Sequence, residues 1–346
     1  MFRLLKPLLF SFSPETAHNI VMRFLFILRY VPLSSFILRL FYSFRSPALE
    51  KDVMGIKFPN PVGLAAGFDK NGDMYNELSN FGFGFIEIGS VTPTEQPGNP
   101  KPRCFRLIDD NAIINRMGIN NKGVKFAVTS LKENHPRVII GGNISKSTTS
   151  SNEQAPLDYE KSFAQLYDFV DYFVVNVSCP NVKGLTKLQD IASLSEIVHK
   201  LTTLRKYLDD YRPILLKISP DLTYDQLDEI IDLILVSGLD GIVATNTTTS
   251  RNELKTFKER VDSIGEGGLS GEPLYKKSLE MVRYISKKTN GQLPIIGVGG
   301  IMSPKQAQEM IKAGACLIQI YSGFIFKGPG IVKRILKHLA KHNKAC

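Results

Sequence analysis

Short apolar runs recur along the chain from residue 61 onward, and a stretch with helical spacing follows most of them. The runs are about five residues long and rich in Val, Ile, Leu and Phe, which is typical of buried strands. Helical patterns occupy 157–170, 191–208, 224–236, 303–313 and 331–340. The eight runs are 61–64, 85–89, 138–142, 173–177, 213–218, 241–244, 294–298 and 317–321.

Eight strands that alternate with helices predict an α/β fold, and specifically a closed (β/α)8 TIM barrel. A doubly wound open sheet is the alternative. In a barrel, the residues that follow the strands meet at one mouth, where the active site lies. The long second and third connections, of which residues 92–120 form the largest part, are predicted to be loops over that mouth.

The first 45 residues have a different pattern, which predicts a helical hairpin ahead of a barrel domain at 46–346. Ser13, Pro14 and Glu15 are typical of a helix start, and this helix is predicted to reach about Tyr30. A second helix is predicted for 32–44. The longest uncharged apolar run, 24–28, is too short to cross a bilayer, so we expect no transmembrane helix.

The charge of the N-terminal segment indicates a membrane surface as its partner. The net charge is +10, and residues 1–45 hold six Lys/Arg against one acid, together with ten of the 33 aromatic residues. A basic, aromatic segment suits an anionic membrane, whereas its apolar bulk disfavours nucleic acid. We therefore predict peripheral attachment to the membrane and no nucleic-acid partner. A hairpin packed wholly against its own domain is the alternative.

The four cysteines, Cys104, Cys179, Cys316 and Cys346, are widely separated and form no CxxC pair. This spacing argues against a disulfide framework or a zinc site and fits a reducing compartment. The predicted location is therefore the cytoplasmic face of a bacterial-type cell membrane, with no metal site.

Polar and small residues follow the predicted strands. Lys217 lies inside an apolar strand, where it is unfavourable unless it meets an anion or an electron-rich ring. Glycines at 297–300 match the usual phosphate site of a barrel. Four asparagines from separate parts of the chain could bind a small amide or imide ring whose carboxylate meets Lys70. These are Asn115, Asn176, Asn181 and Asn246.

The strand at 173–177 leads to a thiol. Pro180 cannot continue a central ladder, so the strand must stop by Cys179. A thiol between Asn176 and Asn181 could take or give a proton beside a planar polar ligand. The alternative is a turn with a buried free cysteine.

Ten motifs follow one another along the chain: GLAAGFDKNG, EIGSVTP, PGNPKPRCFR, INRMGINN, NVSCPN, LLKISPDL, ATNTT, GGLSG, PIIGVGG and IYSGFIFKGP. Together these stretches resemble the dihydroorotate dehydrogenase family, flavoproteins of pyrimidine synthesis. The extension with SPETAH resembles the membrane-associated, quinone-using class 2 members, whereas a cysteine at the base position is typical of the soluble class 1 members. The motifs extend over essentially the whole chain.

The resemblance implies oxidation of (S)-dihydroorotate to orotate in de novo UMP biosynthesis, with FMN as cofactor and a membrane quinone as acceptor. It implies that Cys179 is the catalytic base. The implied FMN-binding residues are Ala66, Gly67, Ser90, Asn143, Asn176, Lys217, Thr245, Gly271, Gly300, Tyr321 and Ser322. The implied substrate-binding residues are Lys70, Asn115, Arg116, Met117, Gly118, Ile119, Asn176, Asn181, Asn246 and Thr247. His18, Arg106 and Tyr321 would lie at the quinone entrance.

Three other readings of the sequence stay open. A class 1-like enzyme that uses fumarate or NAD would leave residues 1–45 without a role. A tRNA dihydrouridine synthase would be basic and carry a cysteine, but it would not explain the four asparagines. A barrel scaffold without catalysis would have no need of Lys70, Cys179 and Lys217.

Overall fold

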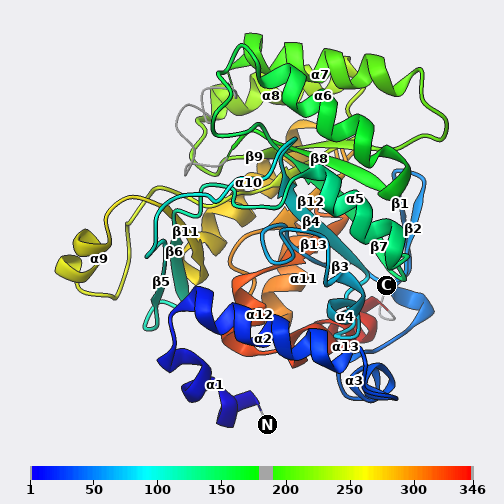
Figure 1. Ribbon diagram of the computed structural model, residues 1–346. Coiled ribbons are helices and arrows are strands. Elements are labelled where there is room, and N and C mark those ends of the chain that lie inside the picture. The colour runs from blue at the N-terminus through cyan, green and yellow to red at the C-terminus, as the bar shows by residue number, and fades with distance from the viewer. Residues whose placement is uncertain (1, 179–189, 344–346) are drawn as a thin grey trace.

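The computed structural model describes residues 2–178 and 190–343, and its centre is a closed barrel of eight parallel strands (Figure 1). The eight strands coincide with the eight apolar runs, so the barrel prediction is confirmed and the open sheet is wrong. Their order around the barrel is β3 (Val62–Leu64), β4 (Phe85–Val91), β7 (Ile139–Ile144), β8 (Tyr172–Asn176), β9 (Ile214–Ile218), β10 (Gly241–Ala244), β12 (Ile295–Val298) and β13 (Leu317–Ile320).

Helices surround the barrel because their apolar stripes pack on the outer faces of the strands. In α8, Thr223 and Gln226 form a capping box and Gly238 ends the helix in the left-handed region, so both ends are set by the local sequence. The helices around the barrel are α4 (Tyr75–Ser79), α5 (Val124–Glu133), α6 (Ala155–Leu166), α7 (Ile191–Arg205), α8 (Tyr224–Ser237), α10 (Tyr275–Lys288), α11 (Pro304–Lys312), α12 (Ser322–Lys327) and α13 (Gly330–Asn343).

An antiparallel hairpin, β1 (Lys51–Val53) and β2 (Ile56–Phe58), packs against the N-terminal ends of the barrel strands. The Phe58 ring lies 5.3 Å from the Phe85 ring and 6.5 Å from the Tyr172 ring, and all three residues are buried. Burying an aromatic ring of this size stabilises the fold by about 2–3 kcal/mol. This end of the barrel is therefore filled by side chains, which leaves the C-terminal strand ends for a site.

A second sheet lies beside the mouth, where the sequence predicted a loop. It joins β5 (Cys104–Leu107), β6 (Ala112–Asn115) and the distant β11 (Gly268–Gly271) in antiparallel pairs. With α9 (Lys258–Ile264) it forms an excursion that projects from the barrel (Figure 1). The loop prediction was wrong for β5 and β6, because each strand has only four residues and their partner comes from about 150 residues further along the chain.

The N-terminal segment forms three helices rather than two: α1 (Phe2–Ser11), α2 (Pro14–Leu28) and α3 (Ser34–Tyr42). The predicted helix start is confirmed, because the Ser13 Oγ accepts a hydrogen bond from the Thr16 N–H at 3.2 Å. The prediction missed α1, which contains Pro7. Among the helices of the described residues, none combines the length and apolar character needed to cross a membrane.

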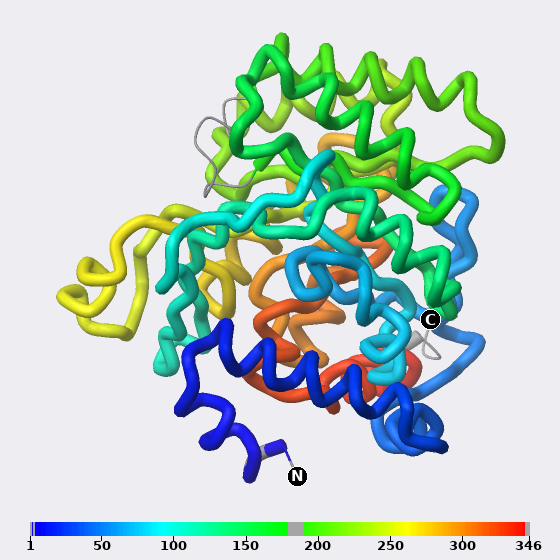
Figure 2. Tube along the Cα trace, viewed as in Figure 1, coloured from blue at the N-terminus to red at the C-terminus, as the bar shows by residue number. Residues whose placement is uncertain are grey.

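Ion pairs hold α2 against the barrel. Arg29 donates two hydrogen bonds to the Glu77 carboxylate at 2.8 and 2.9 Å, and a third to the Asp73 carbonyl at 2.8 Å. Near the start of α2, Arg103 donates to Glu15 at 2.7 Å. Leu25, between them along the helix, is buried. In Figure 2, α2 is the long dark blue helix that crosses the lower part of the molecule.

We expect Arg29→Met to loosen α2, because it leaves the buried Glu77 carboxylate without its guanidinium partner. Hydrogen bonds between charged groups each contribute about 1.5–3 kcal/mol, so the free energy of unfolding should fall by about 2–3 kcal/mol. Hydrogen exchange of the α2 amides should quicken. Arg39→Met, at an exposed position of α3, is the control. Equal rates of α2 amide exchange in the two variants would contradict the proposal that the Arg29–Glu77 ion pair holds α2 in place.

Candidate active site

A cavity of about 480 Å³ begins at the barrel mouth and continues between the N-terminal helices. Polar and small residues line the barrel part, whereas the outer part is mainly apolar. The barrel lining includes Ala66, Gly67, Ser90, Asn176, Lys217, Thr245, Asn246, Gly300 and Gln319. The outer lining includes Phe2, Leu5, Leu9, Phe10, Ala17, Val21, Phe24 and Leu25. One cavity thus joins two chemically different compartments.

A buried carboxylate lies beneath the barrel part of the cavity. Glu87, on β4, is fully buried and lies 3.5 Å from the Lys217 ammonium on β9. It also accepts hydrogen bonds from Asn143 on β7 at 2.8 Å and from Gln319 on β13 at 2.5 Å. Lys217 therefore has the anion that its place in an apolar strand requires, while it still lines the cavity.

A row of hydrogen bonds continues from this carboxylate across the strand ends. Ser90 donates to the Asn143 side chain and accepts from the Asn176 amide at 2.8 Å. The Asn246 amide donates to the Asn176 oxygen at 3.2 Å and to the Ser178 hydroxyl at 3.0 Å. Asn176 and Asn246, two of the four predicted asparagines, are therefore held in fixed orientations at the mouth.

Lys70 reaches the cavity from the loop after β3. That loop is anchored by the buried Asp69, whose carboxylate accepts from the Asp73 and Met74 amides at 3.1 and 3.0 Å. Among the described residues, no hydrogen bond or ion pair engages the Lys70 ammonium. Burial lowers the pKa of Lys70, and the nearby Arg103 adds to this effect. The Lys70 ammonium group is therefore available to bind an anionic ligand.

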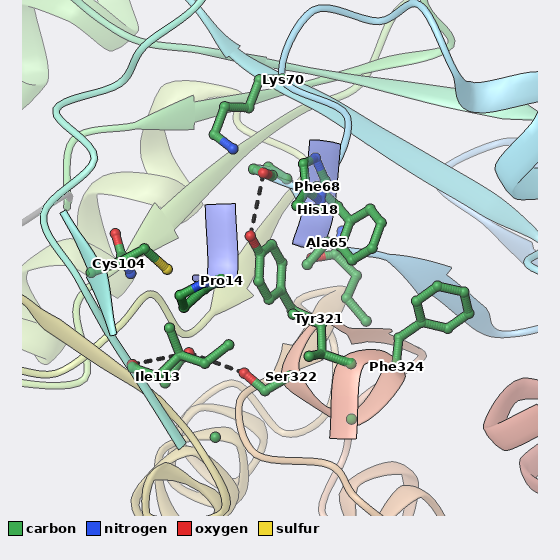
Figure 3. A pocket seen from close by; sticks show the side chains of 18 of the residues that line it. Pro14, His18, Ala65, Phe68, Lys70, Cys104, Ile113, Tyr321, Ser322 and Phe324 are labelled. Atoms are coloured by element: carbon green, nitrogen blue, oxygen red, sulfur yellow. Dashed lines mark hydrogen bonds between the residues drawn. The ribbon is translucent and has the colours of Figure 1, made fainter. Parts of the chain in front are cut away.

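The loops after β12 and β13 meet β11 at the side of the cavity. Gly300 has φ +66°, and a Cβ there would lie 2.6 Å from the Gly271 carbonyl and 2.7 Å from the Tyr275 N–H. Only glycine permits this approach. The hydroxyl of Ser322, the first residue of α12, lies 3.0 Å from the hydroxyl of Ser270 on β11 (Figure 3). Small residues and hydroxyls around backbone amides suit a phosphate group.

Aromatic side chains mark the passage between the two compartments (Figure 3). The Phe68 ring lies 5.1 Å from the His18 ring and 5.5 Å from the Tyr321 ring. Burial lowers the pKa of His18 to about 3, and the Lys70 charge acts in the same direction. His18 is therefore a neutral part of the lining at physiological pH.

Arg106 brings a cation to the outer compartment. Its guanidinium donates to the Phe10 and Phe12 carbonyls at 3.2 and 2.7 Å and lies 4.5 Å from the centre of the Phe10 ring. Its Nε is buried and has no hydrogen-bond partner among the described residues. Burial lowers the pKa of Arg106. Arg106 therefore adds a guanidinium group to the lining of an otherwise apolar space.

Most of the predicted site residues line this one cavity. Asn143 instead lies behind Ser90, and the Arg116 side chain donates to the Ile264 carbonyl at 2.6 Å in the α9 excursion. Cys179 and Asn181 lie outside the described residues. The remaining residues of the predicted sets that line the cavity are Lys70, Asn115, Met117, Gly118, Ile119, Thr247, Gly271, Tyr321, Ser322, His18 and Arg106.

Sequence reasoning missed Glu87, Gln319 and Phe68. An acid in the run Phe85-Ile86-Glu87-Ile88 was a usable signal, because a buried acid needs a partner of the kind that Lys217 supplies. Gln319, a polar residue in the apolar run 317–320, was a similar signal, whereas Phe68 carried none, since only the closed barrel brings it to the cavity.

The fold and the site define a barrel whose mouth suits a flat, phosphorylated cofactor beside a second, apolar compartment. The family model described as dihydroorotate dehydrogenase matches residues 48–342. The protein of Christiangramia forsetii named dihydroorotate dehydrogenase (quinone) is 49% identical over 332 residues, which cover 96% of each chain. A protein of the same name from Idiomarina loihiensis is 43% identical over 344 residues, 98% of this chain and 100% of that one.

Among solved structures, that of Eimeria tenella DHODH in complex with ferulenol superposes with a TM-score of 0.84 at 34% identity, covering 96% of this chain and 92% of that one. The chain belongs to the dihydroorotate dehydrogenase family. This membership bears out the resemblance seen in its sequence motifs.

We expect Glu87→Leu to lower the free energy of unfolding by about 3–5 kcal/mol, because it leaves the Lys217 charge buried and unpaired. Glu87→Gln should lower it less, since an amide can still hydrogen-bond. Denaturant unfolding measures both variants, with the exposed Glu95→Leu as the control. A Glu87→Leu protein as stable as the Glu95→Leu control would refute the role of this pair.

His18 predicts a pH dependence of stability. Its folded pKa of about 3 is below the unfolded value of about 6.5, so the unfolded state binds the extra proton between these values. The contribution of His18 is complete above about pH 6.5 and falls as the pH drops, by at most about 1.4 kcal/mol per pH unit. When the free energy of unfolding is measured at several pH values, it should depend less steeply on pH in His18→Gln than in the parent. The exposed His135→Gln should keep the parent slope.

Proposed function

We propose that the protein oxidises dihydroorotate to orotate in pyrimidine biosynthesis, with FMN as cofactor and a membrane quinone as electron acceptor. The family supports the reaction, and the relatives named above carry the quinone-dependent name. The observation that carries the proposal is the cavity that joins a polar barrel mouth to an apolar passage between α1 and α2. A polar substrate and an apolar one could reach opposite sides of a group held between them.

The residues at the mouth fit FMN. Lys217, Ser90, Asn176 and Thr245 offer donors and acceptors for a polar ring, while Ala66 and Gly67 leave space for a flat one. Gly271, Gly300 and Ser322 would hold its phosphate. When bound, FMN supplies an acceptor for the hydride of the substrate and a donor for the quinone. Glu87 and Asn143 hold the side chains below it in place.

Dihydroorotate would lie on the other side of the mouth. The Lys70 ammonium would bind its carboxylate, and the amides of Asn115, Asn176 and Asn246 would bind its ring. We include Asn181, Thr247 and the 116–119 segment in the substrate site. For Arg116 this contact would come from the backbone, because its side chain is engaged by Ile264 and Glu266. Fixed donors hold the substrate in one orientation, which is the positioning part of catalysis.

Cys179 would remove the proton from C5 of dihydroorotate. It follows Ser178 directly, and the Ser178 hydroxyl contacts Asn246 at the mouth. A thiol has a pKa of about 8.5, so a small fraction is thiolate at neutral pH.

The quinone would occupy the apolar compartment. His18 and Tyr321 would contact its head, and the Arg106 guanidinium would donate to one of its carbonyls. The exposed apolar side chains of α1–α3 support attachment of residues 1–45 to an anionic membrane at its cytoplasmic face. They include Leu4, Leu8, Phe24, Ile27, Leu33, Phe36, Leu40 and Phe41. Residues 46–346 would form the catalytic domain.

The test is anaerobic reduction of the purified yellow protein by dihydroorotate, followed by reoxidation with quinones, fumarate and NAD. We expect bleaching of the flavin and rapid recovery of its colour with quinones alone. A colourless protein that takes up no FMN would refute the enzymatic proposal. Recovery with fumarate or NAD as fast as with quinone would refute the assignment of the acceptor.

Cys179→Ala should slow flavin reduction by roughly 10²–10⁴-fold, the range for loss of a general base. Cys179→Ser should slow flavin reduction less. The rate of this variant should keep rising to higher pH than that of the parent, because a hydroxyl ionises far less readily than a thiol. Stopped-flow bleaching across pH measures all variants. Cys316→Ala is the control, because Cys316 precedes β13 at the opposite end of the barrel. An alanine variant at position 179 that matched this control would show that another group is the base.

A further inference from the structure

The net positive charge of the chain is concentrated in its two terminal segments. Residues 310–346 contain seven Lys/Arg and no acid, and residues 1–45 contain six Lys/Arg and one acid. The intervening residues 46–309 hold 30 Lys/Arg against 32 Asp/Glu. All of the net positive charge therefore comes from the ends, while the greater part of the barrel is close to neutral.

The described parts of the two terminal segments, 2–45 and 310–343, lie side by side in the fold. Near the start of α13, the Lys333 ammonium donates to the Leu40 and Phe41 carbonyls at the end of α3, at 3.0 and 2.8 Å. Just before α13, Gly328 packs on Phe2 so closely that a Cβ there would lie 2.3 Å from the ring. Figures 1 and 2 show α12 and α13 at the same edge of the molecule as α1–α3.

One side of α13 carries a basic stripe, which we define as Lys333, Lys337 and Lys341. Residues four apart lie on the same side of a helix, so the stripe continues from the point where Lys333 meets α3. Lys337 and Lys341 are exposed, whereas the opposite face of the helix is buried. Leu40 and Phe41, which Lys333 contacts through their backbone, have side chains that are 63% and 65% exposed. The stripe therefore borders the exposed apolar surface.

We infer that the basic stripe of α13 binds anionic lipid headgroups, as the electrostatic part of the surface whose apolar part is α1–α3. The inference rests on the proposed attachment to a membrane and adds a barrel helix to it. Apolar side chains enter any bilayer, but ammonium groups distinguish anionic from zwitterionic lipid. The neighbouring apolar side chains favour a bilayer over a nucleic acid, which would leave them in water.

The test measures partitioning of the full-length holoenzyme onto vesicles of phosphatidylcholine alone or mixed equally with phosphatidylglycerol. The variant is Lys337→Gln with Lys341→Gln. The control is Lys161→Gln with Lys206→Gln, which changes the net charge equally at exposed positions on α6 and after α7. These helices lie at the opposite edge of the molecule (Figure 1). Melting curves and flavin reduction by dihydroorotate are measured on every protein.

We expect the α13 variant to bind anionic vesicles about tenfold or more weakly at low salt, since each lysine near such a surface contributes about a fivefold factor. Its binding to phosphatidylcholine, its melting and its flavin reduction should match those of the parent. Undiminished binding to anionic vesicles, or an equal loss in the control pair, would overturn the inference. So would tight binding of an oligonucleotide that the same substitutions abolish. Failure of dihydroorotate to reduce the parent flavin would count against the proposed function alone.

Discussion

The site depends on one buried ion pair, Glu87 with Lys217. An isolated charge at either position would be strongly unfavourable in this interior, and together they are tolerated only because Asn143 and Gln319 satisfy the carboxylate. These four residues come from four different barrel strands. The orientation of Ser90, Asn176 and Asn246 follows from the same network, so the polar side of the mouth is fixed by an interaction below it.

The other half of the site belongs to the N-terminal helices. Arg29 and Glu15 attach α2 to the barrel at separate points, and the helices add their apolar side chains to the cavity wall. The extension is therefore both a packing element and a lining. The alternative in which the hairpin only packs on its own domain does not account for the large apolar side chains that it leaves exposed.

The barrel could be predicted from the sequence because each strand is a short apolar run and each βα unit is local. The β5–β6–β11 sheet could not, since strands of four residues carry little periodicity and their pairing spans distant segments. Lys217 was predicted to need an anion or an electron-rich ring, but its partner Glu87 was not predicted. The hydrogen bonds from Arg106 to the Phe10 and Phe12 carbonyls depend on how α1 packs against the barrel. The local sequence pattern does not determine that packing.

The burial of His18 bears on the supply of protons. An imidazole with a pKa of about 3 carries no acidic proton at neutral pH, so it cannot deliver one as an imidazolium. Arg106 does not release its proton either, because a guanidinium stays protonated in proteins even where burial lowers its pKa. Neither His18 nor Arg106 can therefore pass a proton to a ligand in the apolar compartment. A quinone reduced there, as proposed, would need its protons from another donor, such as the reduced cofactor or water.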